Sequence, residues 1–343
     1  MKKRELELDL LRILAMVTVI LVHCQRIIDR VDAPGVRSFY SVLSTLYTWE
    51  IPVFVMISGR FFLDPSREMP FRTIMKAVKR IIVAFLFWNI IYQVFYILSG
   101  DYSGLNWKGI VAQAFEGPYH FWFLFMIAGL YLITPFLRLI AKRKRLTEYY
   151  LLLFFCVELC TGYLTDLPFI GRLFSVLSQK GALHFVTGFS GCYLLGYYLH
   201  EYTPSKRTEL ILYGTAVLLA FAASFATLKQ FYPAGASSEY FYQYLKPNII
   251  VVASAIYVFF TKRVSRHPFS RAGATIISFL SEHSFGIYLV HALYADLLLN
   301  TGMLSLNVFP LAILPEHALR VLLVSLVTVF LLRRIPMLGK MIT

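Results

Sequence analysis

Arg12 and His23 are the residues whose types and spacing most suggest chemistry, and both lie in an apolar stretch near the N-terminus. They are eleven residues apart. In an α-helix that spacing is three turns plus about 20°, so both side chains would lie on one face, about 16 Å apart along the axis. Asp9 would pair with Arg12 on this face. Singly, Arg12 could reach lipid headgroups and His23 could bond a neighbouring helix; their alignment favours a functional role.

Further titratable residues lie in apolar stretches, where each ionisable side chain costs about 2.5–3.5 kcal/mol. Glu50 lies near the middle of the second stretch, close to Pro52. Its carboxyl either stays protonated and structural or orients a histidine ring, and the sequence leaves both readings open. His120 begins the fourth stretch, and His291 follows Ser284 by seven residues on one helical face.

From these positions we expect three histidines and a carboxylate to converge in the outer half of a membrane, with cations on the cytoplasmic side. The histidines are His23, His120 and His291, the carboxylate is Glu50, and the cations are Arg12, Lys76, Lys79 and Arg80. This arrangement suits an anionic donor that enters from the cytosol. No metal centre is predicted, because no two of these histidines have ligand spacing on one helix and no H-E-x-x-H pattern occurs.

The elements that must position these residues are long and apolar. The chain has 343 residues, of which 58% are hydrophobic and 15% charged, whereas a soluble domain carries about a quarter charged residues. Apolar stretches near the ~20 residues needed to cross a bilayer recur along the chain. We therefore predict an all-α, polytopic bundle of about ten transmembrane helices. They lie near 10–28, 39–63, 74–98, 121–140, 148–165, 182–200, 208–228, 247–261, 276–299 and 309–332.

The basic residues predict an orientation for this bundle. With the N-terminus in the cytoplasm, the inner segments hold 21 Lys and Arg and the outer loops hold 8. An excess of Lys and Arg in cytoplasmic loops is typical of membrane proteins, so we expect both termini to be cytoplasmic. The net charge of +14 is then a topology signal, and no nucleic-acid partner is expected. The loops are too short for an extramembrane catalytic domain, and residues 1–343 read as one membrane domain.

Four stretches, taken in order, resemble the motifs of the acyltransferase family 3 membrane proteins. They are Leu8–Ala15 followed by His23, Pro52–Gly59, His120–Leu124 and Ser284–His291. These correspond to the family's opening helix, its P-x-F-F-x-x-S-G stretch, its H-x-W-F-L motif and its S-x-G-I-Y-L-x-H segment. The resemblance spans nearly the whole chain.

The resemblance implies a bacterial plasma-membrane enzyme that moves an acyl group, usually acetyl, from acetyl-CoA to a glycan hydroxyl. It implies no bound cofactor; acyl-CoA is a co-substrate, and a glycan or lipid-linked saccharide is the acceptor. His23 would be the base, with Glu50 or His120 orienting its ring. Lys76 and Arg80 would correspond to an R-x-x-x-R pattern. Lys in the first position keeps the charge but loses bidentate geometry. The residues expected around the donor or acceptor are Asp9, Arg12, Lys76, Arg80, Trp122, Ser284 and His291.

A membrane transporter of a small polar solute is the alternative, since intramembrane Arg, Glu and His also mark solute and proton paths. Against it, the sequence shows no clear internal repeat and no paired broken helices. Direct transfer to the acceptor and transfer through an acyl-enzyme remain equally open, as does the identity of the acceptor.

Overall fold

The described part of the chain in the computed structural model is helical, with no strand. It comprises residues 4–30, 34–103, 106–164, 171–180, 186–234, 243–300, 309–336 and 339–343. The α-helices are α1 (Leu6–Cys24), α2 (Pro34–Tyr47), α3 (Glu50–Phe62), α4 (Phe71–Ser99), α5 (Trp107–Glu116), α6 (Trp122–Ala141), α7 (Lys144–Gly162), α8 (Gly171–Lys180), α9 (Phe189–Glu201), α10 (Lys206–Ala234), α11 (Pro247–Lys262), α12 (Arg271–Asn300), α13 (Ile313–Leu332) and α14 (Gly339–Ile342). Short 3₁₀ turns include η1 (Gln25–Arg30), η2 (Tyr119–Phe121), η5 (Val264–Arg266) and η6 (Pro310–Ala312).

Seven helical segments in the described part are long and apolar enough to cross a membrane, which makes this a multi-pass membrane protein. They are Gly35–Phe62, Phe71–Ser99, Tyr119–Ala141, Lys206–Lys229, Pro247–Arg266, Arg271–Asn300 and Ile313–Leu332. The other three expected spans correspond to α1, α7 and α9. Helix α9 has only 13 residues, and α1 and α7 carry charges near their beginnings. The count of ten stays a prediction.

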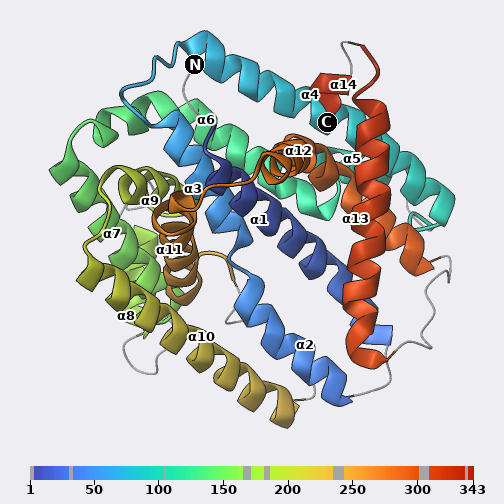
Figure 1. Cartoon of the computed structure of the whole chain (residues 1–343). Coiled ribbons are helices and arrows are strands. Elements are labelled where there is room, and N and C mark those ends of the chain that lie inside the picture. The colour runs from blue at the N-terminus through green and yellow to red at the C-terminus, as the bar shows by residue number, and fades with distance from the viewer. Residues whose placement is uncertain are drawn as a thin grey trace.

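Helix α1 lies at the centre of the bundle (Figure 1). It packs against α12, α3, α13 and α11, and Leu8, Leu11 and Ala15 are completely buried. A helix packed against four others can hold a charged residue on its buried faces only if a neighbour supplies a partner, since desolvation of an unpaired charge is costly. The central place of α1 therefore explains why Asp9 and Arg12 are paired with each other.

The second expected span is interrupted. Helix α2 ends at Tyr47 and α3 begins at Glu50. Proline lacks a backbone N–H and is tolerated in the first turn of a helix but not in its interior, so Pro52 accounts for the break just before it. The break leaves the Glu50 side chain, which is completely buried, at the first turn of the second segment.

Helices α3 and α9 approach each other more closely than any side chain would permit. A Cβ added at Gly59 would lie 1.8 Å from the main-chain oxygen of Tyr193, and one added at Gly196 would lie 2.1 Å from that of Met56. Small residues at such contacts are typical of membrane helix pairs, where close backbone packing provides the attraction. This contact fixes α3 as one wall of the site described below.

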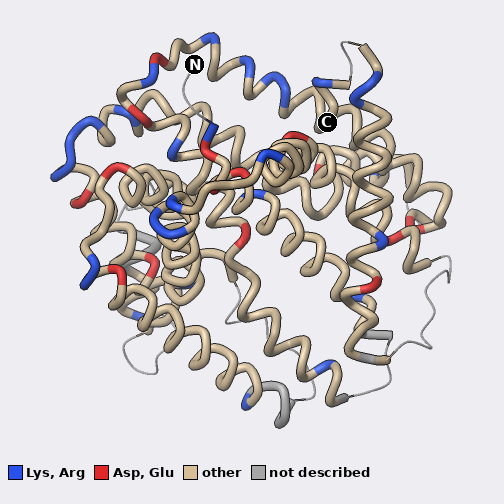
Figure 2. Tube along the Cα trace, viewed as in Figure 1, with Lys and Arg blue, Asp and Glu red and all other residues tan. Residues whose placement is uncertain are grey.

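The two ends of the described chain meet at one end of the bundle. Arg4 donates to Glu282 of α12 at 2.7 Å, and Arg333, just after α13, donates to the main-chain oxygen of Glu282 at 2.6 Å. Lys and Arg residues of the first half of α4 lie along the same edge (Figure 2). Both ends on one side agree with an even number of crossings; their cytoplasmic location stays a prediction.

Candidate active site

Three histidines from three separate elements meet in the interior. The ring centroid of His23 lies 5.1 Å from that of His291 and 6.0 Å from that of His120, and the last two are 5.2 Å apart. His291 is completely buried and His120 is 2% exposed. We call these residues the histidine cluster. It unites the polar residues of the first, fourth and ninth expected spans.

Local sequence explains how each ring reaches the cluster. His23 lies in the last turn of α1, and His291 lies within α12. His120 lies in the 3₁₀ turn η2, which follows a sharp turn at Gly117. Gly117 has a φ of 73°, a backbone conformation that residues other than glycine rarely adopt. A Cβ there would also lie 2.9 Å from the Phe85 ring. Glycine at this position therefore lets the chain turn under α4 and direct His120 inward.

Hydrogen bonds define the state of His291. Its Nδ1 lies 2.6 Å from the main-chain oxygen of Tyr288. A carbonyl oxygen only accepts, so Nδ1 carries a proton and, in the neutral ring, Nε2 holds the lone pair. That Nε2 is buried without a hydrogen-bond partner among the described residues, as are both ring nitrogens of His120. Buried polar atoms without partners are rare in native proteins and call for a functional explanation.

Two tyrosines hold the elements of the cluster together. The Tyr288 hydroxyl donates to the main-chain oxygen of His120 at 2.5 Å. The Tyr92 hydroxyl of α4 donates to the main-chain oxygen of Leu289 at 3.1 Å and accepts from the Leu293 amide at 2.8 Å. These bonds join α4, η2 and α12 around the rings. No sequence motif pointed to Tyr92, because its partners lie far along the chain.

A cavity of about 500 Å³ begins at Arg12. We call it the Arg12 cavity. Its lining combines apolar side chains with Arg12, Arg80, Arg333, Ser58, Tyr131, Ser281, Glu282, Ser284 and Tyr288. Three arginines against one glutamate give it a positive balance. A concave site of this size, with a few convergent polar groups, is typical of small-molecule binding.

The Arg12 guanidinium is oriented by a short network. Its Nη1 donates to Asp9 Oδ1 at 2.9 Å and to the Ser281 hydroxyl at 3.0 Å, and Ser281 also donates to Asp9 at 2.6 Å. The predicted pairing of Asp9 with Arg12 is present. Arg4 Nε adds a bond to Asp9 Oδ2 at 2.5 Å. Arg4 also bonds to Glu282, so two carboxylates balance Arg4 and Arg12, and the positive excess that suits an anionic ligand comes from Arg80 and Arg333.

The other expected donor-side residues are only partly brought together. Arg80 lies over the Phe285 ring, 4.9 Å from its centroid, and lines the Arg12 cavity. It also donates to the main-chain oxygen of Thr343 at 2.6 Å. Lys76 is exposed and is not among the residues that line this cavity. Arg333, which was not among the expected donor-side residues, does line it.

The described contacts of Glu50 and Trp122 are with residues other than the three histidines. Neither carboxyl oxygen of Glu50 has a hydrogen-bond partner of ordinary geometry among the described residues, although Tyr244 approaches it. The Trp122 ring lies 5.6 Å from Tyr244 and 5.8 Å from Phe189. No described hydrogen bond joins Glu50 to a histidine. The part of the chain that the structure describes thus offers His120 and His291, rather than Glu50, as neighbours of His23.

A second cavity, of about 470 Å³, lies beyond the cluster. We call it the Arg26 cavity. It is lined by Arg26, Tyr96, Asp101, Tyr102, Gln113, Glu116, Gly117, Pro118, Tyr119, Asp296, Leu299 and Asn300. The Tyr119 ring lies 5.2 Å from that of His23. Sequence reasoning singled out none of these residues, because each is an ordinary loop or helix-end residue until the elements assemble.

Two helical segments, α1 with the η1 turn that follows it and α12, each run from the Arg12 cavity past the histidine cluster to the Arg26 cavity. Helix α1 carries Arg12 and then His23, and Arg26 follows in η1. Helix α12 carries Ser281, then His291 and then Asp296. Residues advance about 1.5 Å each along a helix, so the histidines lie between the cavities. None of the three histidines lines either cavity, but Tyr288 of the Arg12 cavity and Tyr119 of the Arg26 cavity each pack against a histidine ring.

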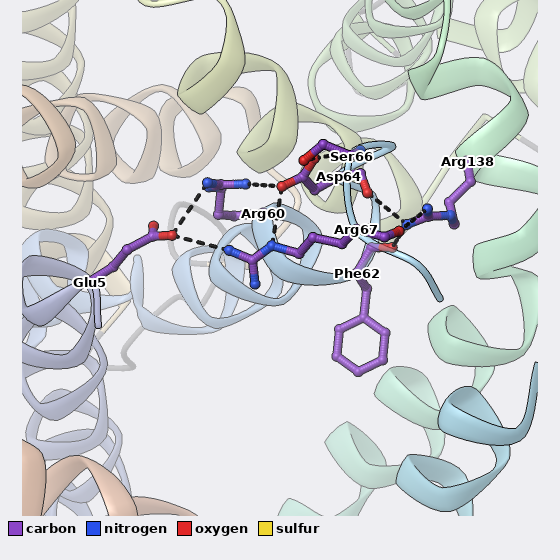
Figure 3. A network of polar contacts seen from close by, with 7 residues as sticks. All are labelled: Glu5, Arg60, Phe62, Asp64, Ser66, Arg67 and Arg138. Atoms are coloured by element: carbon purple, nitrogen blue, oxygen red, sulfur yellow. Dashed lines mark hydrogen bonds and ion pairs between the residues drawn. The ribbon is translucent and has the colours of Figure 1, made fainter. Parts of the chain in front are cut away.

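A polar network joins the beginning of α1 to the end of α3 (Figure 3). Glu5 Oε1 accepts from Arg60 and Arg67, each at 3.3 Å, and both arginines also donate to Asp64. Burial would raise the pKa of Asp64, but hydrogen bonds from Ser66 and Arg60 outweigh it and hold that pKa well below its usual range. The network ties α1 to α3 and to the α3–α4 loop. It also pairs both arginines with carboxylates, whereas Arg80 and Arg333 of the Arg12 cavity bond to main-chain oxygens.

The described residues contain no group of three or more His, Cys, Asp or Glu arranged to hold a metal ion. Comparison with protein families gives one match: the model described as an acyltransferase domain covers residues 5–333. No curated protein and no solved structure matches the chain.

Proposed function

The chain belongs to acyltransferase family 3, and on that premise we propose that it transfers an acyl group from acyl-CoA to a hydroxyl of a cell-surface glycan or lipid-linked saccharide. Acetyl is the proposed acyl group, and the plasma membrane of a bacterium is the proposed location. One observation carries the proposal: the histidine cluster lies between a cationic cavity and a second cavity. Family membership does not favour the alternative of a solute transporter.

The donor is proposed to bind in the Arg12 cavity. Coenzyme A is polyanionic at its phosphates and uncharged along its pantetheine arm. Arg12, Arg80 and Arg333 would hold the phosphates through charge-assisted hydrogen bonds. The apolar walls, which include Phe54, Ile81, Phe123 and Ile127, would contact the arm and lead the thioester toward the histidine cluster. Lys76, exposed near the entrance, would contribute only long-range attraction.

His23 is the proposed general base. In direct transfer, the acceptor hydroxyl oxygen attacks the thioester carbonyl carbon while His23 takes the hydroxyl proton. The carbon–sulfur bond then breaks, and the proton passes to the leaving thiolate, which gives an ester and free coenzyme A. Alternatively, His23 accepts the acyl group first and passes it to the acceptor in a second step. Both routes use the same atoms and release the same products.

His291 and His120 are proposed as positioning residues for His23. The Nε2 lone pair of His291 is buried and unpartnered among the described residues, and its ring lies 5.1 Å from that of His23. A hydrogen bond from His23 to this atom would select the His23 tautomer whose other nitrogen faces the acceptor. A second group that orients a histidine base is a recurrent device in acyl transfer. Glu50 has no such contact and is assigned no step.

The test is thiol release from acetyl-CoA by purified protein, with saccharide acceptors present. We expect His23→Ala to lower turnover about 10²–10⁴-fold, the usual contribution of a general base. The matched control is His283→Ala, which removes a buried histidine of α12 that is not part of the histidine cluster. The centroid of the His283 ring lies 4.2 Å from that of Phe279. Retained turnover in His23→Ala, or equal loss in His283→Ala with both proteins folded, would contradict the assignment.

A further inference from the structure

We propose that the Arg26 cavity binds the acceptor, and that this acceptor is a neutral saccharide or an amino sugar rather than an anionic glycan. The inference rests on the proposed acyl transfer and adds a site and a charge class to it. The opposite charge of the two cavities provides the argument: cations line the one proposed for the polyanionic donor, and carboxylates line the other.

The charge balance of the Arg26 cavity is negative. Asp101, Glu116 and Asp296 line it, against a single cation, Arg26. That cation is already neutralised, since Arg26 Nη1 lies 2.9 Å from Asp296 Oδ1. Two carboxylates therefore remain without a basic partner among the residues that line the cavity. Like charges brought together at a binding site oppose association, so a uronic acid or a phosphorylated glycan would be rejected here.

The remaining chemistry of the lining suits hydroxyl groups. An ionised carboxylate is only an acceptor, with two oxygens and about four lone-pair sites, and so matches the donors of a sugar ring. The carboxylate of Asp101 is already oriented, because the Ser99 hydroxyl donates a hydrogen bond to it at 2.6 Å. Tyr96, Tyr102 and Tyr119 add aromatic faces, each with a polar tip, against which the apolar face of a sugar can pack. An ammonium group of an amino sugar would be attracted by the same carboxylates.

The position of the cavity makes it competent for transfer. Tyr119 lines it, and the Tyr119 ring lies 5.2 Å from His23 and 5.3 Å from His120. Arg26 is three residues beyond His23, and Asp296 is five beyond His291. Those separations correspond to about 5 and 8 Å along a helix axis, less than the length of a disaccharide. A hydroxyl of a sugar held here can therefore reach the histidine cluster, where the thioester is proposed to arrive.

The experiment uses the full-length protein in detergent micelles on an array of immobilised oligosaccharides. The array carries neutral glycans, amino-sugar glycans, uronic acid glycans and phosphorylated glycans. The test variant is the double substitution Asp101→Asn, Glu116→Gln, which removes both unpaired carboxylates; the two residues are exposed, so the fold is not expected to change. The matched control is Glu316→Gln, since Glu316 is a helix-end carboxylate paired to Arg320 outside the cavity.

We expect the wild type and Glu316→Gln to bind neutral and amino-sugar glycans in preference to anionic ones. The affinity of the double variant for these glycans should be lower by a factor of about ten or more, as expected for the loss of charge-assisted hydrogen bonds. Binding to anionic glycans in preference, binding to none, or unchanged affinity in the double variant would overturn the proposal. A parallel assay separates the two hypotheses: if thiol release from acetyl-CoA depends on the protein, acyl transfer stands even when the acceptor proposal fails.

Discussion

At the scale of single residues, Arg12 shows how a charge can be stable in the centre of a membrane protein. It shares Asp9 with Arg4 and bonds to Ser281. Each hydrogen bond to a charged group contributes about 1.5–3 kcal/mol, enough to offset much of the cost of insertion. Asp9 also accepts hydrogen bonds from Arg4 and Ser281. Substitution of Arg12 therefore does not leave the Asp9 carboxylate without a hydrogen-bond partner. Its effect on function can therefore be separated from an effect on folding.

We predict that Arg12→Ala raises the KM for acyl-CoA about 10–100-fold, the loss expected for one or two bonds to phosphate. Arg12→Lys should recover only part of this, since lysine keeps the charge but not the planar donor pair. Steady-state kinetics with varied acyl-CoA measure both. Arg334→Ala is the control, because Arg334 lies over the Phe330 ring and outside the Arg12 cavity. A fall in kcat with KM unchanged would argue against a donor-binding role.

At the scale of elements, the contact between α3 and α9 shows that function depends on close helix packing. Helix α3 contributes Ile51, Phe54, Ser58 and Phe62 to the lining of the Arg12 cavity. The distance between α3 and α9 is set by Gly59 and Gly196, because each glycine faces the backbone of the other helix. Backbone cannot move aside as the end of a flexible side chain can. A single methyl group must therefore separate the two helices and shift one wall of the cavity.

We expect Gly59→Ala and Gly196→Ala each to lower the free energy of unfolding by about 1–3 kcal/mol, the usual cost of overpacking. Gly214→Ala is the matched control: a Cβ there meets nothing within 4 Å, and alanine favours a helix over glycine by about 1 kcal/mol. Thermal unfolding in detergent, followed by circular dichroism, measures all three. Equal melting temperatures for Gly59→Ala and the wild type would show that α3 and α9 are less tightly packed than the structure has them.

At the scale of the whole molecule, charge is distributed along the proposed path of transfer. Arginines line the cavity near the two ends of the chain, and carboxylates line the cavity beyond the histidines. In Figure 2, Lys and Arg residues follow one another along the first half of α4, at the top edge of the view. Retention of Lys and Arg in the cytoplasm during insertion would orient this edge inward. The Arg12 cavity would then open toward the compartment that contains acyl-CoA.

This orientation predicts how a membrane-impermeant maleimide labels two variants, each with one introduced cysteine. The background variant replaces Cys156, which is exposed, and Cys160, which is partly exposed, with alanine; Cys24 and Cys192 are buried. In right-side-out vesicles we expect Lys108→Cys to be labelled and Lys144→Cys to react only after permeabilisation. The parent with both alanines controls for residual thiols. The reverse pattern would place the Arg12 cavity on the outer side and exclude cytosolic acyl-CoA as donor.

The sequence alone determined the helical, membrane-spanning class of the chain, because hydrophobic length and period are local properties. It also determined the stripe of Asp9, Arg12 and His23, since residues at helical spacing share a face whatever surrounds them. Only the tertiary structure decided which distant residues complete the site. His120 and His291 join His23, no described hydrogen bond joins Glu50 to them, and Arg333 rather than Lys76 lines the Arg12 cavity. Those outcomes depend on how helices far apart in the chain pack and rotate, and no local period encodes that.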